Sequence, residues 1–346
     1  MKIRFVKVTL SVMFLVGGIS AAFGQERPVP TPPRPPAVPR VDVRVPTVRL
    51  PRPPRRGESI DSEMRIASSS GVNLKFCVAE ADLKINGWER NEVRVYVRSG
   101  LRFEMRVLER ENGTDRAHWV WIRPPQPQGA GQGPAPACLS GDTIEMDVPI
   151  GAVLSIEGRS TDTVVDSVRK VGIKIVEGSI AIRNVTDGIT ASALQGDLVI
   201  ENSSGAISLD STTGNIAVFG VKPGQIGDAF RAKTNSGSIS VQQSIHRQID
   251  ASSISGSVLF SGALLEGGIY SFKTSNGAIE LALPESVSAK IAASFGFGSF
   301  DSDLPIEILT ENEFPGGKSI VGTIGAGTTN VNVTTTSGRI GIRKQD

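Results

Sequence analysis

Ile207-Ser-Leu-Asp-Ser-Thr-Thr-Gly214-Asn-Ile-Ala-Val218 is one copy of the pattern that decides the fold of this chain. Apolar side chains lie seven and five residues before the glycine, and two and four residues after it. Alternation with a period of two buries one face of a β-strand. Gly, Ser, Thr and Asn favour a tight turn between two such strands. The stretch therefore predicts a strand, a turn and a second strand.

The same pattern recurs around seven glycines and once more, in isolation, near the C-terminus. These turn glycines are Gly178, Gly196, Gly214, Gly237, Gly256, Gly277 and Gly298, and the isolated copy is at Gly338. Their separation of about twenty residues is typical of solenoids. One unit holds too few apolar side chains for a core of its own, whereas stacked units share a continuous core.

We therefore expect an all-β fold: a two-sided parallel β-solenoid of about seven coils over residues 151–303, with capping strands at 304–346. The first coil carries no glycine near Thr161, so its turn is expected to be irregular. An antiparallel β-sandwich would also produce alternating strands. The fixed register of so many copies favours the solenoid.

The N-terminus has the features of a signal peptide over residues 1–24. Lys2, Arg4 and Lys7 precede an apolar run, and Ala22-Phe23-Gly24 is typical of a cleavage site. This predicts export to the periplasm, cell surface or extracellular space, and an uncleaved anchor remains an alternative. Residues 25–57 form a Pro/Arg-rich linker, which we expect to be disordered. It is either a basic tether that contacts anionic envelope polymer or membrane surface, or a plain solvated spacer.

Residues 58–150 form a separate N-terminal β region. It contains both cysteines, Cys77 and Cys138, and in an exported chain an even number of cysteines predicts a disulfide between them. Two free buried thiols are the alternative. A metal site has little support, since His118 and His246 are the only histidines. Trp119 and Trp121 alternate with Val120 and Ile122 in an expected strand, and for these tryptophans ordinary packing competes with carbohydrate binding.

Three pieces of the chain together resemble the bacterial putative-adhesin β-strand-repeat family of unknown function. They are Leu83-Lys-Ile-Asn-Gly-Trp-Glu-Arg-Asn-Glu-Val-Arg-Val, Ile144-Glu-Met-Asp-Val-Pro-Ile-Gly-Ala-Val-Leu-Ser-Ile, and the repeats with their close at Gly322-Thr-Ile-Gly-Ala-Gly and Thr336-Ser-Gly-Arg-Ile-Gly-Ile. The resemblance implies an envelope-exposed β-solenoid. It implies no catalytic residues and no cofactor.

These patterns favour a non-enzymatic envelope protein that acts as a binding or scaffold module. A polysaccharide lyase or hydrolase on a β-helix is one alternative, and it needs paired carboxylates. Asp301 and Asp303 are the best such pair in the sequence, but they lie where a strand is expected to end. A scaffold that self-assembles through open solenoid ends is another alternative, which the C-terminal cap would block. We expect no metal and no nucleic-acid partner; the partner would be an envelope protein or glycan.

One outward row of the solenoid is a candidate docking strip. Three residues after each of the first five glycines lie small or apolar side chains: Ala181, Val199, Ala217, Ser240 and Leu259. Stacking in register makes this row contiguous, and contiguous apolar surface usually marks a covered face. The N-terminal region of the chain or a partner would dock there. Alternatively, these residues are merely tolerated on an exposed sheet.

Overall fold

The computed structural model describes residues 60–125 and 138–345, all of which belong to a compact unit spanning residues 54–346. The predicted signal peptide and Pro/Arg-rich linker lie outside the described residues, as does most of the loop from 124 to 136. The described residues form 22 β-strands, and none of them forms a helix that could cross a membrane. The all-β prediction is confirmed.

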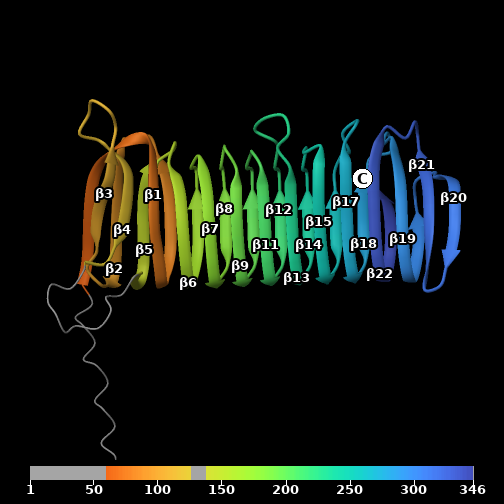
Figure 1. Ribbon diagram of the computed structural model, residues 1–346, viewed down its shortest axis with the longest axis horizontal. Coiled ribbons are helices and arrows are strands. Elements are labelled where there is room, and N and C mark those ends of the chain that lie inside the picture. Colours follow the sequence, from red (N-terminus) through yellow and green to blue (C-terminus); the bar gives the residue numbers. More distant parts are fainter. Residues whose placement is uncertain (1–59, 126–137, 346) are drawn as a thin grey trace, which may run out of the picture. The chain divides into compact units, whose positions relative to one another are not determined.

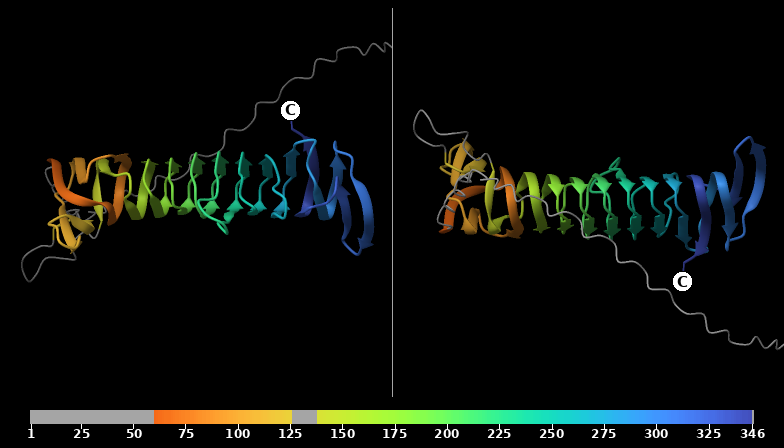
Figure 2. Two further views of the ribbon diagram at one scale, coloured as in Figure 1. Left: turned by 90° about the horizontal axis from the view of Figure 1, so that it is seen from above. Right: turned by 90° about the horizontal axis from the view of Figure 1, so that it is seen from below.

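The central coils each contribute one strand to sheet I, turn at a glycine, and return in sheet II (Figures 1 and 2). The sheet I strands are β7 (Lys170–Glu177), β9 (Ile189–Gln195), β11 (Ile207–Thr213), β13 (Phe230–Ser236), β15 (Gln248–Ser255) and β17 (Ile269–Asn276). The sheet II strands are β8 (Ile180–Arg183), β10 (Leu198–Glu201), β12 (Ile216–Phe219), β14 (Ile239–Gln242), β16 (Val258–Ser261) and β18 (Ile279–Leu283).

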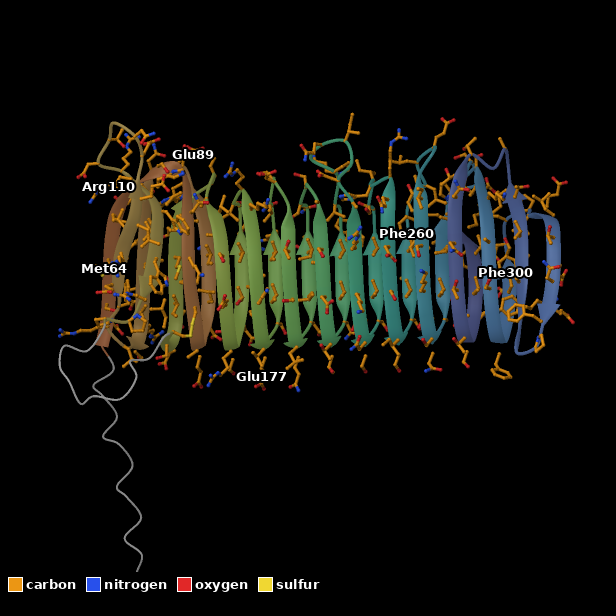
Figure 3. The ribbon with its side chains drawn as sticks, viewed as in Figure 1. Met64, Glu89, Arg110, Glu177, Phe260 and Phe300 are labelled. Carbon is orange, nitrogen blue, oxygen red and sulfur yellow. A yellow bond between two sulfur atoms is a disulfide. The ribbon has the colours of Figure 1, made fainter. Side chains whose placement is uncertain are left out.

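Like strands pair in parallel, with the repeat positions aligned. Ile216 pairs with Leu198 on one side and with Ile239 on the other, and all three are buried. The apolar side chains of both sheets face each other along the whole stack and make one continuous core, in which Phe260 is fully buried (Figure 3). The two-sided parallel solenoid is confirmed, because burial falls on the inward positions that the sequence pattern predicts.

The first coil is regular, contrary to the expectation from its missing glycine. It consists of β6 (Val153–Asp166), which contributes to both sheets and pairs with β7 and β8. Thr161 occupies the place of the turn glycine, and its hydroxyl Oγ1 donates to the carbonyl oxygen of Ala81 at 2.9 Å. A side chain that satisfies a neighbouring carbonyl replaces the glycine here.

The C-terminal strands depart from the predicted order. They are β19 (Ala289–Ser302), β20 (Glu307–Phe314), β21 (Gly317–Ile324) and β22 (Thr329–Lys344). The Gly338 copy in β22 is a full coil of the stack, and it lies between the coil of β17 and β18 and the coil of β19. Residues 304–346 are therefore not all a cap: only the antiparallel β20–β21 hairpin extends sheet I beyond β19.

The N-terminal region is part of the same stack and not a separate domain. Its strands are β1 (Ile60–Trp88), β2 (Glu92–Gly100), β3 (Glu104–Arg110), β4 (Ala117–Arg123) and β5 (Leu139–Pro149). Residues 73–86 of β1 form a coil that pairs with β6 on one side. On its other side β1 pairs with β4 in sheet I and with β5 in sheet II. The coils built from β1 and from β22 therefore both have neighbouring strands on either side, although β1 and β22 are the first and last strands of the described chain.

Candidate functional site

The turn glycines form a column along one corner of the stack. Seven of the eight have positive φ: Gly178, Gly196, Gly214, Gly237, Gly256, Gly277 and Gly338. A Cβ on each would overlap a backbone carbonyl oxygen of the preceding layer, which for Gly237 is that of Gly214. Gly298 lacks the positive φ, yet its Cβ would overlap the carbonyl oxygen of Gly338. The column therefore needs glycine because the layers approach closely, as well as for its backbone angles.

A buried ladder of hydroxyl groups supports this column. Thr234 Oγ1, for example, donates to the carbonyl oxygen of Gly214 at 3.0 Å. Equivalent bonds join Ser211 to Gly196, Ser253 to Gly237, Thr274 to Gly256 and Thr335 to Gly277. A buried carbonyl without a partner is costly. Each of these Ser or Thr residues lies three residues before the turn glycine of its own coil, and it stabilises the turn of the preceding coil.

A second ladder lies one residue after the glycines, at the start of sheet II. Asp197 Oδ1 accepts from the backbone N–H of Asn215 at 2.7 Å, and Asn215 Oδ1 accepts from that of Ser238 at 2.9 Å. Ser238 and Ser257 continue the row with longer bonds to the next layer. The polar side chains at this corner are therefore used to join layers, so they are poor candidates for ligand binding.

The candidate docking strip lies on the outer face of sheet II. Each member pairs with the next in register, in the order Ala181, Val199, Ala217, Ser240 and Leu259. Ala217 is exposed and the others are partly exposed. Val164 of β6 extends the row by one layer and is 38% exposed. The row ends at Glu280, which pairs with Leu259.

Polar rows border this strip on both sides. The joining ladder of Asp197, Asn215 and Ser238 runs along one side, and Arg183, Glu201 and Gln242 lie two residues beyond the strip on the other. Phe219 interrupts the second row and is 43% exposed, so it widens the apolar surface beside Ala217. An apolar centre with a polar border is the usual anatomy of a protein interaction surface.

The carboxylates of Asp301 and Asp303 do not form an open pair. Arg343 Nη2 lies 2.5 Å from Asp301 Oδ2, and Arg343 Nη1 lies 3.2 Å from Asp303 Oδ1. Hydrogen bonding to Asp301 raises the pKa of Arg343 above its ordinary value. Arg339 adds an ion pair to Glu280 at 2.6 Å. These charges join β18, β19 and β22 on the outer face of sheet II, which is a structural use of both carboxylates.

An acidic hollow of about 410 Å³ lies at the corner near the N-terminal end. Its charged lining is entirely acidic: Glu80, Asp82, Asp142, Asp162 and Glu177. No His, Lys or Arg lines it. Among the residues that the structure describes, no group of three or more His, Cys, Asp or Glu side chains is arranged to hold a metal ion.

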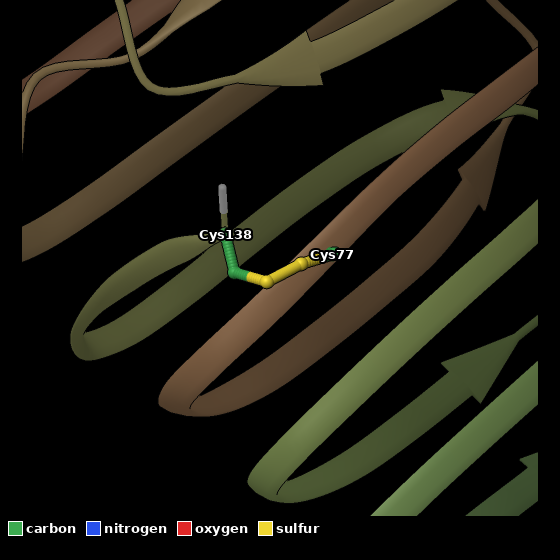
Figure 4. The surroundings of a disulfide bond; sticks show 2 residues. All are labelled: Cys77 and Cys138. Carbon is green, nitrogen blue, oxygen red and sulfur yellow. A yellow bond between two sulfur atoms is a disulfide. The ribbon is translucent and has the colours of Figure 1, made fainter. Parts of the chain in front are cut away.

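The predicted disulfide is present close to this hollow (Figure 4). Cys77 of β1 and Cys138, just before β5, have Cα atoms 4.6 Å apart and are bonded through their sulfur atoms. Val78 pairs with Leu139, so the two cysteines precede a paired position on adjacent strands. The bond fastens the β1 coil to the strand that covers it.

At the opposite corner, His246 is fully buried beneath the loops that connect successive coils. Its Nε2 lies 3.0 Å from the carbonyl oxygen of Gly205, and its Nδ1 lies 3.1 Å from Ser244 Oγ. Burial lowers the pKa of His246 below 6.5. The ring also packs against Phe230. His246 is therefore a neutral core residue that holds the loops in place. His118 contacts Ser69 Oγ at 3.0 Å and is distant in sequence from these groups.

Trp119 and Trp121 lie on β4, near the N-terminal end of the solenoid. Trp119 is 42% exposed, and Arg123 lies over the ring of Trp121 at 4.9 Å. Arg123 also forms an ion pair with Glu104. The Trp121 ring is thus occupied by an intramolecular cation, while Trp119 remains open to solvent.

The Toastrack family DUF4097 matches residues 230–343. The matched segment is similar to a Toastrack repeat region. It contains the coils from β13 to β22, and the match confirms the family resemblance drawn from the sequence. No curated protein matches the chain.

Three solved structures are similar over most of the chain but at low identity. A putative cell adhesion protein from Clostridium sporogenes is 13% identical, covers 83% of this chain and 100% of its own, and has a TM-score of 0.19. A putative lipid binding protein from Parabacteroides distasonis is 10% identical, with coverage of 82% and 98% and a TM-score of 0.34. A putative adhesin from Parabacteroides merdae is 8% identical, with coverage of 66% and 94% and a TM-score of 0.21. At these scores, none of the three carries an assignment to this chain.

Proposed function

We propose that this Toastrack protein is an exported, non-enzymatic component of the cell envelope that acts as a β-solenoid binding or scaffold module. The outer strip of sheet II, from Val164 to Leu259, supports this proposal. It is a continuous row of small or apolar side chains over six layers, and successive layers repeat at about 4.8 Å. A surface of this kind favours an extended partner that runs along the stack, either an envelope protein or a glycan.

The location follows from the N-terminal sequence. A signal peptide over residues 1–24 would deliver the protein to the periplasm, the cell surface or the extracellular space. The linker at residues 25–57 is rich in arginine and would add weak contacts to anionic envelope polymer or membrane surface. In this arrangement the linker holds the protein near the envelope, and the strip binds the partner.

A double variant tests the strip. Val199→Lys with Leu259→Glu places charges on two outward positions, so the fold should be kept and binding lost. Purified wild-type protein would be incubated with cell-wall sacculi, extracted envelope polysaccharide and solubilised envelope proteins, and the bound fraction measured. The matched control is Thr190→Lys with Ser252→Glu, which makes the same charge changes on the outer face of sheet I. Binding that the strip variant keeps, or that the control loses equally, would contradict the proposal.

A further inference from the structure

The two ends of the solenoid differ in how many strands extend each sheet. At the N-terminal end, sheet I continues beyond the β1 coil by two strands, β4 and β3. Sheet II continues beyond the same coil by three: β5, β2, and the first segment of β1, residues 60–67. Among the described residues, β3 pairs only with β4, and residues 60–67 pair only with β2. Both edges therefore offer backbone groups to a further strand.

The C-terminal end is protected against such pairing in sheet I. There β21 and β20 extend sheet I past the end of sheet II, and Leu304 and Ile306 cover the inner side of β21. On β20, Glu311 and Glu313 lie opposite Ile320 and Lys318, so both carboxylates are on the inner face. Lys318 forms ion pairs with both of them. Inward charges and a bulged edge strand are devices that prevent sheet extension.

The N-terminal end carries apolar groups at the equivalent places. Met64 and Ile66 lie opposite the buried Val95 and Val93, and therefore face the inner side of sheet II. Met64 is 38% exposed although its position is an inward one (Figure 3). On β3, Met105 lies opposite the buried Ile122 and faces inward in sheet I. Leu101, just before β3, and Leu108 within it are 43% and 46% exposed. The core is thus left open at this end.

We propose that a second copy of this protein docks on the N-terminal end and closes the core as a two-fold symmetric dimer. A two-fold axis parallel to the strands places sheet I of one copy in line with sheet II of the other. In each of the two joined sheets, the two strands β4 and β3 of one copy then continue into the three strands of the other copy, which are residues 60–67, β2 and β5. Five strands therefore separate the two β1 coils in both sheets. Head-to-tail stacking would instead join two strands with two in sheet I and three with none in sheet II, counted beyond the β1 coil and the β19 coil, so the layers would not match.

The same rotation makes the edge strands parallel and complementary. In sheet I of one copy β3 runs against the repeat strands, and residues 60–67 of the partner run in the same direction as β3 after the rotation. If Glu104 lies opposite Arg65 of the second copy, then Met105 is beside Ile66. Arg102, two residues before β3 begins, lies opposite Glu63 when the pairing continues past the start of β3. Opposite charges then alternate on the outer face and apolar side chains meet on the inner face, which is the favourable cross-strand arrangement.

Size-exclusion chromatography with light scattering, and sedimentation equilibrium, test the dimer on purified protein that retains residues 25–346. Wild-type protein should have twice the mass of one chain. Met64→Glu should raise the dimer dissociation constant by about 100-fold or more, because each substitution occurs twice in a two-fold interface. Ile308→Glu is the control: it also replaces an apolar side chain with glutamate, at a 50% exposed site on β20 at the C-terminal end, and should leave the dimer intact.

A charge exchange separates this interface from a defect in folding. Glu63→Arg and Arg102→Glu should each weaken the dimer, and the variant that carries both should recover it, since opposite charges again face each other. A wild-type protein that is monomeric at 100 µM (~ten times a weak micromolar dissociation constant) overturns the proposal. So does an open-ended polymer, loss of association in Ile308→Glu alone, or a double charge variant that stays monomeric.

Discussion

Replacing Gly237 with alanine should test the column of turn glycines more directly than any change in the core. Gly237 has φ of 151°, and a Cβ there would overlap the carbonyl oxygen of Gly214 in the preceding layer. The backbone conformation alone costs alanine about 1–3 kcal/mol. The overlap is with backbone, so no rotation of a side chain relieves it, and forced separation of packed groups adds about 1–3 kcal/mol. We therefore expect a loss of about 2–6 kcal/mol in the free energy of unfolding.

Gly227 is the matched control, because it separates the two contributions. It also has a positive φ, of 95°, but no atom lies within 4 Å of the position its Cβ would take. Gly227→Ala should therefore cost only the backbone term, about 1–2 kcal/mol. Both glycines lie in the same region of repeats, so one unfolding transition reports on both.

Urea unfolding followed by far-UV circular dichroism would measure the two variants. The expected difference between Gly237→Ala and Gly227→Ala is the overlap contribution, about 1–3 kcal/mol. Equal losses for the two variants would show that the close approach of layers does not restrict the turn. The reasoning about the glycine column would then be wrong, whatever the absolute values.

Three further predictions concern buried polar groups and the disulfide. Thr234→Val should cost about 1–3 kcal/mol in urea unfolding because the Gly214 carbonyl loses its hydroxyl partner, whereas Thr190→Val on the exposed face should cost less than about 0.5 kcal/mol; equal effects would refute the ladder. The lowered pKa of His246 favours its neutral form in the fold, so this contribution to stability is present above pH 6.5 and lost as the pH falls below it. A His246→Gln variant should show a smaller loss of stability between pH 7.5 and 5 (~one unit or more on either side of the ordinary histidine value), and an unchanged loss would contradict this. Replacing Cys77 and Cys138 together with serine should lower stability by about 4 kcal/mol, measured in the same way against wild type, and no loss would show that the 61-residue span is held by other contacts.

The order of the coils at the C-terminal end does not follow from the repeat pattern. Gly338 has the same local surroundings as the other turn glycines, and Gly298 has them except for Ser302 in the last apolar position, so each predicts one coil. Nothing in those surroundings says that the Gly338 coil lies before the Gly298 coil in the stack. Every coil offers the same backbone edges and the same inward apolar positions, so neighbouring coils are interchangeable by local criteria. The β20–β21 hairpin, which sends the chain back by one layer, decides the order.

The sequence alone determined the strands, the turns, the inward face and the outward strip, because alternation and turn chemistry act over a few residues. It also predicted the Cys77–Cys138 bond, although only from compartment and count. Five Ser or Thr residues three positions before a glycine were a visible signal for the hydroxyl ladder, but their partners lie in the preceding layer. The inclusion of β1 in the stack, the position of β22, and the difference between the two ends were decided only by the tertiary structure. These features depend on pairings between residues far apart in the chain, and a pattern that repeats in every coil does not specify which coils pair.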